Sequence, residues 1–210
     1  MKGLDAKICI VDDDEAFRDS LRWLLESNGF QVESFASAKE FLESCMSGKP
    51  GCLVLDIRMP EMTGLELQEK LNEKGIHTPV IFVTGHGDIP MAVSAVKQGA
   101  MDFIEKPFNE SDMLELIRNA LVLDTQRRET DEQQSLISSR LEKLTSREQE
   151  VMECVIAGKP NKLIADQFGI TVKTVEAHRA KVMDKMAVNS LAELVQLVVG
   201  KRVQTTNDQD

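Results

Sequence analysis

Short apolar runs and amphipathic stretches alternate over the first 123 residues of the chain. Five runs are short, apolar and rich in β-branched or aromatic residues, as buried strands are, and they cover residues 7–11, 30–35, 52–55, 80–83 and 101–104. Apolar residues at helical spacing follow each run, which predicts helices from about Phe17 to Leu25 and at 38–45, 64–73, 88–98 and 111–122. Strands that alternate with helices over short connections form right-handed βαβ units. The pattern therefore predicts a doubly wound α/β domain with a parallel five-stranded sheet over residues 1–123.

The pattern changes after residue 123. Residues 124–135 contain no apolar residue, so residues 124–140 are expected to form a linker that is either a solvated helix or flexible. Beyond Thr145 the apolar spacing is wholly helical, with helices expected at 145–157, 161–168, 171–186 and 191–199. These helices predict an all-α four-helix domain over residues 141–203. Residues 204–210 have no core-forming side chain and are expected to be a disordered tail.

Composition adds expectations about where the protein works. The hydrophobic fraction of 42% is ordinary for a globular protein, and no stretch approaches the roughly 20 apolar residues of a membrane-spanning helix. The first residues carry no apolar run long enough for a signal peptide. Four cysteines, Cys9, Cys45, Cys52 and Cys154, show no CxxC pairing and are expected to be reduced. We therefore expect a cytoplasmic protein with no membrane partner.

The charge is distributed unevenly between the two parts of the chain. The net charge of −10 argues at first against a nucleic-acid partner. Residues 140–202, however, hold 11 Lys and Arg against 8 Asp and Glu, a net charge of +3, so the remainder carries −13. An acidic front and a mildly basic back indicate different partners for the two parts.

Polar residues of a particular kind follow the predicted strands of the first domain. Asp12 and Asp13 follow the first strand, Asp56 the third, Thr84 the fourth and Lys106 the fifth. With the flavodoxin-like strand order 2-1-3-4-5, the carboxyl ends of these strands meet at one edge of the sheet, where doubly wound domains bind ligands. Clustered carboxylates repel one another by about 4 kcal/mol per close pair, and Mg²⁺ would relieve that repulsion. Carboxylates, metal, hydroxyl and ammonium together predict a phosphoryl site in which a carboxylate is the nucleophile.

The last domain shows the pattern of a helix-turn-helix. Ala165 allows two helices to cross closely and Gly169 allows the turn between them. On the second helix, an apolar stripe with Arg179 at its margin is expected to face inward, and the outward side chains are predicted to contact DNA. Lys173, Thr174, Lys181 and Lys185 suit phosphates, whereas Glu176, Ala177 and Ala180 suit base edges.

The segments VDDD, VLDIRMP, FVTGHGD and EKPF, in this order, closely resemble the receiver domain of bacterial response regulators. The resemblance implies that Asp56 is the phosphoacceptor, that Asp13, Asp56 and the Arg58 carbonyl ligate Mg²⁺, and that Asp12 acts through metal-bound water. It further implies that Thr84 and Phe103 form the switch pair and that Lys106-Pro107 is a cis peptide. Arg58, Gly85 and His86 occupy positions that tune the phosphoryl lifetime in that family.

The segment from TSREQEVM to DKM resembles the LuxR-type DNA-binding domain, and TVEAHR is closest to its FixJ-like subgroup. Many relatives have Lys or Val where this chain has Glu176 and Ala177, so their operators do not predict this one. Together the two resemblances imply a transcription regulator that a histidine kinase phosphorylates and that binds promoter DNA. On phosphorylation we expect a homodimer formed through Ile89, Met91 and Val96, and we expect RNA polymerase as a further partner.

Two alternatives stay open at the level of sequence. An aspartyl-phosphate phosphatase would have a second Asp two residues after the nucleophile, and this chain has Arg58 there; we therefore expect no enzyme beyond self-catalysed phosphoryl transfer and hydrolysis. A regulator that binds DNA independently of phosphorylation, with a purely structural acidic pocket, is the second alternative.

Overall fold

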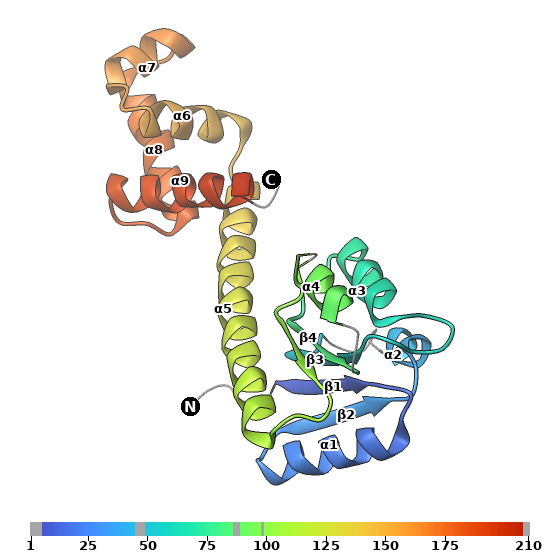
Figure 1. Cartoon of the computed structure of the whole chain (residues 1–210). Coiled ribbons are helices and arrows are strands. Elements are labelled where there is room, and N and C mark those ends of the chain that lie inside the picture. The colour runs from blue at the N-terminus through green and yellow to red at the C-terminus, as the bar shows by residue number, and fades with distance from the viewer. Residues whose placement is uncertain (1–5, 45–48, 86–88, 98, 208–210) are drawn as a thin grey trace. The chain divides into compact units, whose positions relative to one another are not determined.

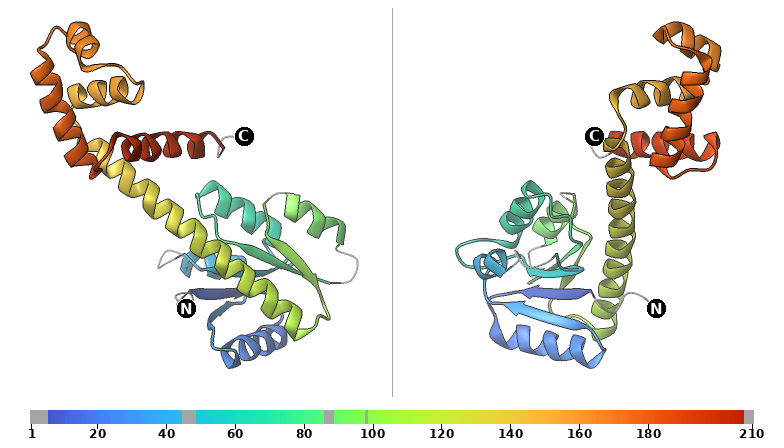
Figure 2. Two further views of the ribbon diagram at one scale, coloured as in Figure 1. Left: turned by 90° about the vertical axis from the view of Figure 1, so that its left-hand side faces the viewer. Right: turned by 180° about the vertical axis from the view of Figure 1, so that it is seen from behind.

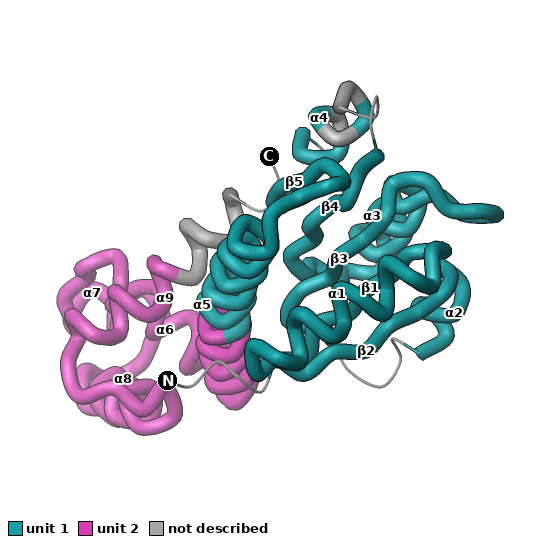
Figure 3. The backbone as a smooth tube through the Cα atoms, turned by 60° about the horizontal axis from the view of Figure 1, so that its bottom comes forward, with its two compact units in different colours: residues 1–128 teal, residues 129–210 magenta. Residues whose placement is uncertain are grey.

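The computed structural model describes residues 6–44, 49–85, 89–97 and 99–207 and divides into two compact units, residues 1–128 and 129–210 (Figures 1 and 3). Unit 1 contains five parallel strands in the order β2-β1-β3-β4-β5, as the alternation of strands and helices predicts. The strands are β1 (Lys7–Val11), β2 (Gln31–Phe35), β3 (Cys52–Asp56), β4 (Val80–Thr84) and β5 (Asp102–Glu105). The first four helices are α1 (Glu15–Ser27), α2 (Ala38–Ser44), α3 (Gly64–Glu73) and α4 (Ile89–Lys97).

Helices cover both faces of this sheet (Figure 2). On one face, alternate strand residues such as Ile10 and Val54 pack against α1 and the first turns of α5 (Glu110–Glu142). On the other, residues such as Val11 and Leu55 pack against α2, α3 and α4. Strands β1, β3 and β4 are nearly continuous apolar runs because both of their faces are buried. The ends of these strands are therefore held at fixed positions by two cores.

Helix α5 is longer than the predicted helix 111–122, because residues 124–140 continue it without a break. Polar contacts attach its last turn in unit 1 to the loops that precede β3 and β4. Arg128 donates to Asp124 at 2.6 Å and to the carbonyl of Lys49 at 3.0 Å, and Arg127 donates to the carbonyl of His77 at 3.0 Å. The linker predicted as helical or flexible is thus helical.

Unit 2 contains α6 (Ser146–Ile156), α7 (Asn161–Phe168), α8 (Val172–Met186) and α9 (Leu191–Asn207). Helix α6 begins with a capping box between Thr145 and Glu148, and Gly169 adopts the left-handed conformation that ends α7. Helix α9 extends beyond the predicted end at Val199 and includes residues 204–207, which we expected to be disordered. No proline interrupts residues 201–207, so a helix anchored by buried Leu194 and Val198 propagates along the polar sequence.

Within the described ranges, no helix combines the length and the apolar character that crossing a bilayer requires.

Candidate functional site

Three charged side chains from distant parts of the sequence meet at the carboxyl ends of β1, β3 and β5. The Nζ of Lys106 lies 2.7 Å from Oδ2 of Asp12 and 3.2 Å from Oδ1 of Asp56. The Asp12 side chain is 2% exposed and that of Lys106 27%, so solvent reaches the lysine but hardly the carboxylate. The structure therefore brings together two of the predicted carboxylates and the predicted ammonium.

Backbone groups hold the two carboxylates in place. The other oxygen of Asp12 accepts a hydrogen bond from the N–H of Asp14 at 2.9 Å, and the other oxygen of Asp56 accepts one from the N–H of Arg58 at 2.7 Å. The guanidinium of Arg18 donates to the main-chain carbonyl of Asp12 at 2.7 Å. Both carboxylates are therefore oriented by the loops that leave β1 and β3.

The local electrostatics disfavour the ionised form of Asp56. Burial raises the pKa of this carboxyl above its ordinary value, and the nearby Asp12 charge raises it further. Lys106 and the N–H of Arg58 lower it without cancelling the rise. Burial alone would lower the pKa of Lys106, but its hydrogen bond and charge interaction with Asp12, and then with Asp56, raise it. Lys106 therefore stays an ammonium ion, positioned to neutralise added negative charge.

The remaining predicted site residues lie around this cluster in different environments. Thr84, at the end of β4, is fully buried, and its hydroxyl donates to the carbonyl of Gly85 at 3.1 Å. Phe103 is half-buried on β5 and packs against the core beneath α4. Asp13 is exposed to solvent. The Lys106-Pro107 peptide is cis, as the resemblance implied.

The donor set at this edge is oxygen-rich but small. Across the part of the chain that the structure describes, no three carboxylate, imidazole or thiol side chains form a group that could hold a metal ion. A cation here would therefore need oxygens from the backbone, water or a phosphoryl group in addition to carboxylates. Mg²⁺ fits such a set, since it prefers hard oxygen ligands and retains several waters. Burial and then the charge of Asp12 raise the pKa of Asp56, and a cation would relieve the second of these effects.

Some predicted residues fall partly or wholly outside the described residues. His86 lies outside them, and so does the side chain of Ile89, although its backbone begins α4. Of the other two residues predicted for dimerisation, Met91 is half-buried against the core, whereas Val96 is 38% exposed. Val93, on the same helix, is 41% exposed.

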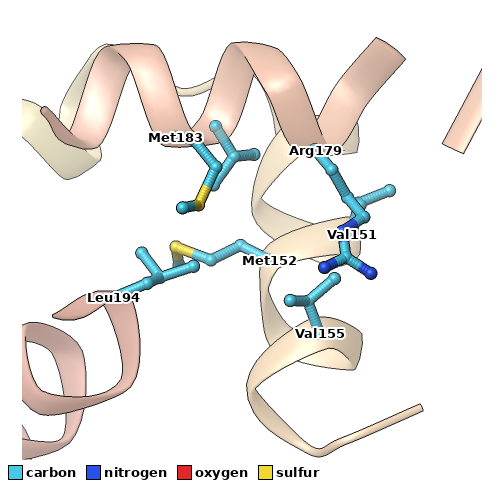
Figure 4. Close-up of a pocket in the computed structure, with 7 residues that line it drawn as sticks. Val151, Met152, Val155, Arg179, Met183 and Leu194 are labelled. Atoms are coloured by element: carbon cyan, nitrogen blue, oxygen red, sulfur yellow. The ribbon is translucent and has the colours of Figure 1, made fainter. Parts of the chain in front are cut away.

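A second candidate site is the outward face of α8. Its inward residues, Val175, Val182 and Met186, are buried in the core of unit 2. Arg179 also points inward, toward Val151 and Val155 of α6 (Figure 4), and donates to Asn161 at 2.6 Å. The predicted DNA-contacting residues on the opposite face are exposed, apart from the half-buried Thr174, and comprise Lys173, Glu176, Ala177, Ala180 and Lys181. Small side chains at two of these positions permit close approach to a groove.

Lys185 is placed differently from the other predicted DNA contacts. Its Nζ lies 2.7 Å from Glu148 and 3.0 Å from the carbonyl of Lys143, so it bridges α8 to the start of α6. Hydrogen bonds from Lys185 and from the N–H of Thr145 lower the pKa of Glu148 to about 2. The structure therefore gives Lys185 a stabilising contact inside unit 2, which sequence spacing does not reveal because its partners lie 37 and 42 residues away.

Comparison with known proteins fits both halves of this description. The response regulator receiver domain family matches residues 8–118, and the LuxR family of bacterial regulatory proteins matches residues 142–198. The transcriptional regulatory protein FixJ of Azorhizobium caulinodans is 43% identical over 95% of this chain and 94% of its own length. The chain belongs to the response regulators with a LuxR-type DNA-binding domain.

Further relatives of this response regulator are similar to it over nearly the whole chain. The response regulator protein TmoT of Ectopseudomonas mendocina is 46% identical over 94% of this chain and 90% of its own. A solved structure of the response regulator StyR covers 92% of this chain and 98% of its own, at 46% identity and a TM-score of 0.85. A solved structure of full-length FixJ from B. japonicum covers 94% of this chain and 98% of its own, at 41% identity and a TM-score of 0.59. The protein is thus a phosphorylation-controlled transcriptional regulator, whose domains imply a histidine kinase partner and DNA.

Two residues near the cluster of Asp12, Asp56 and Lys106 were not singled out from the sequence. Phe17 on α1 lies with its ring centroid 3.8 Å from Nζ of Lys106. Gly64 begins α3 directly against β3, where a Cβ would collide with the main-chain oxygen of Asp56. A glycine after the VLDIRMP segment was a signal for such close approach, but the position of Phe17 resembles an ordinary core position of an amphipathic helix.

Proposed function

We propose that Asp56 is the residue whose phosphorylation controls DNA binding by this regulator. The observation that carries the proposal is the convergence of Asp12, Asp56 and Lys106 at one sheet edge, with Lys106 3.2 Å from Asp56. A carboxylate oxygen of Asp56 attacks the phosphorus of a phosphohistidine on the kinase. The new O–P bond forms as the P–N bond breaks, and the imidazole keeps the electron pair and takes up a proton.

The neighbouring side chains have distinct roles in this step. The phosphoryl group attached to Asp56 adds negative charge next to Lys106. The ammonium of Lys106 therefore shifts its contact from the carboxylate of Asp56 to a phosphoryl oxygen. The Thr84 hydroxyl, now bonded to Gly85, turns to donate to the phosphoryl group. Phe103 then rotates into the space that Thr84 leaves, and this changes the surface formed by α4 and β5.

Asp13, Asp56 and the carbonyl of Arg58 are the residues that would hold Mg²⁺, with Asp12 acting through water. The geometry supports this part of the proposal, because Asp12 and Asp56 both contact Lys106, and two carboxylates with one ammonium retain an excess of negative charge. When bound, Mg²⁺ supplies charge neutralisation for the phosphoryl oxygens during transfer.

Dimerisation then links the receiver to DNA. The changed face includes Ile89, Met91 and Val96, and the exposure of Val96 and Val93 supports its use as a contact surface. A dimer presents two α8 helices to successive half-sites about one DNA turn apart. Lys173, Thr174 and Lys181 contact phosphates, whereas Glu176, Ala177 and Ala180 contact base edges. Bound in this way, the regulator acts on transcription through RNA polymerase in the cytoplasm.

The test measures the phosphorylation and the oligomeric state of the protein in the same samples. Wild-type protein and Asp56→Asn are incubated with Mg²⁺ and acetyl phosphate, and intact mass and light scattering are recorded. We expect one phosphoryl group and a monomer-to-dimer shift in the wild type, and neither in the variant. Equal phosphorylation of Asp56→Asn would contradict the assignment of Asp56, and a phosphorylated monomer would contradict the dimerisation step.

A further inference from the structure

Three groups contact the ammonium of Lys106, and one of them has no role in the mechanism above. Two directions are taken by Asp12 at 2.7 Å and Asp56 at 3.2 Å. In the third direction lies the face of the Phe17 ring, whose centroid is 3.8 Å from Nζ. Two of the three N–H donors of the ammonium group are therefore directed to carboxylates, and the ring lies against the same cation.

The position of Phe17 is built from the same loop that carries Asp12. Asp14 is the N-cap of α1, and its side chain accepts hydrogen bonds from the N–H groups of Ala16 and Phe17 at 3.0 and 3.2 Å. The N–H of Asp14 in turn donates to Asp12 at 2.9 Å. The cap therefore places the ring and the carboxylate on two sides of the same ammonium.

The orientation of the ring is set by a second aromatic side chain. Phe108 follows Lys106 by two residues and meets Phe17 edge to face, with centroids 6.0 Å apart and ring planes at 90°. Both rings also pack against the core beneath α1 and α5. A ring fixed in this way presents its electron-rich face to a cation, and partial exclusion of water strengthens the attraction.

We propose that Phe17 is a positioning residue for phosphoryl transfer, acting through a cation–π contact that directs the ammonium of Lys106 toward the acceptor oxygen. The inference rests on the proposed role of Asp56 and Lys106. Without the ring, the Lys106 side chain, which is already 27% exposed, turns toward water and spends less time where the phosphoryl oxygen forms. A leucine at residue 17 would fill much of the same space in the core but would offer no aromatic face.

The first measurement is the rate of Asp56 phosphorylation by acetyl phosphate with Mg²⁺, in which the O–P bond to Asp56 forms as acetate leaves. Phe17→Leu should slow the reaction about 2- to 30-fold, the range that a cation–π contact supports between exposed and desolvated sites. Phe17→Tyr, which keeps the aromatic face, should restore most of the rate. Phe30→Leu, the same change in the same core but away from Lys106, should leave the rate unaltered.

A double-mutant cycle with Lys106→Met separates positioning from a general effect on the fold. In the Lys106→Met background, Phe17→Leu should change the rate by no more than about twofold, because the contact that it removes is already absent. The same slowing in both backgrounds would overturn the inference, and so would a Phe17→Leu rate equal to that of the wild type. Should Phe17→Leu fail to fold, Phe17→Met provides the same test. A wild type that takes no phosphate at Asp56 would instead contradict the proposed function, and this inference with it.

Discussion

The carboxylate of Asp56 is held in a position that disfavours its own charge. Burial and then Asp12 raise its pKa, and Lys106 offsets this effect only in part. The folded protein consequently binds the Asp56 proton more tightly than the unfolded chain does. Stability from this group is present at low pH, and it is lost as the pH rises from the ordinary value of 3.8 through the raised value. At neutral pH the ionised Asp56 side chain therefore lowers the free energy of unfolding.

Asp56→Asn should therefore be more stable than the wild type at pH 7, because the amide carries no charge. The difference in the free energy of unfolding should shrink as the pH falls through the raised pKa of Asp56 toward 3.8, because the Asp56 carboxyl of the folded protein takes up its proton over that range. Urea titrations at a series of pH values measure this, with the exposed Asp19→Asn on α1 as a matched control. An Asp56→Asn variant less stable than the wild type at pH 7 would contradict the electrostatic account.

At the scale of single residues, the sequence predicted which side chains end the strands but not all of their contacts. Asp12, Asp56 and Lys106 follow apolar runs, and the carboxyl ends of parallel strands share one edge, so their approach could be inferred. The contact of Phe17 with Lys106 could not be inferred, because the two residues are 89 positions apart and the cap at Asp14 sets the position of Phe17. The contact of Lys185 with Glu148 could not be inferred either, because helical spacing gives no sign of a partner 37 residues away.

Among the elements, those with a strong apolar period were predicted within about two residues, whereas helix ends in polar sequence were not. Helix α7 begins and ends as predicted, at Asn161 and Phe168. Helices α5 and α9 run on through stretches with no apolar period, where hydrophobic spacing gives no signal. In α5 the added turns are held by Arg127 and Arg128, whose carbonyl partners lie 50 and 79 residues away.

Glu148, at the start of α6, should make the stability of unit 2 depend on pH. Glu148 is ionised down to a pKa of about 2 because Lys185 and the cap at Thr145 hold its charge. A depressed pKa contributes stability that is present above the ordinary value of 4.5 and is lost as the pH falls from there to about 2. In Glu148→Gln this acid loss should be absent and stability at pH 7 lower. Thermal melts of unit 2 followed by circular dichroism between pH 2 and pH 7 measure both effects. Equal acid loss in the two proteins would contradict the pairing.

At the scale of the whole molecule, the acidic and basic parts of the chain have separate tasks. The net charge of −10 conceals a DNA-binding part of +3. So small a positive charge neutralises few phosphates, and a single copy should bind DNA weakly. Pairing two copies on one site is the way in which such a domain gains affinity.

Two lysines on the same helix should affect DNA binding differently. Lys181 is exposed on the outward face of α8, so Lys181→Met should weaken binding and reduce the salt dependence of the affinity by about one per protomer. Lys185→Met should leave the salt dependence nearly unchanged and lower the melting temperature, because it removes the partner of Glu148. Fluorescence anisotropy at several salt concentrations distinguishes the two. A loss of salt dependence in Lys185→Met equal to that in Lys181→Met would show that Lys185 contacts DNA as Lys181 does.

The central claim is that the state of Asp56 sets the affinity for DNA. The most direct test is the dissociation constant for a duplex selected from a random-sequence pool, measured with Mg²⁺ in the presence and absence of beryllofluoride as a phosphoryl mimic. In the wild type, beryllofluoride should tighten binding by about tenfold or more, as pairing of two weak DNA-binding domains allows. In Asp56→Asn it should change nothing. An equal affinity with and without the mimic in the wild type, at demonstrated occupancy of Asp56, would show instead that DNA binding is independent of phosphorylation.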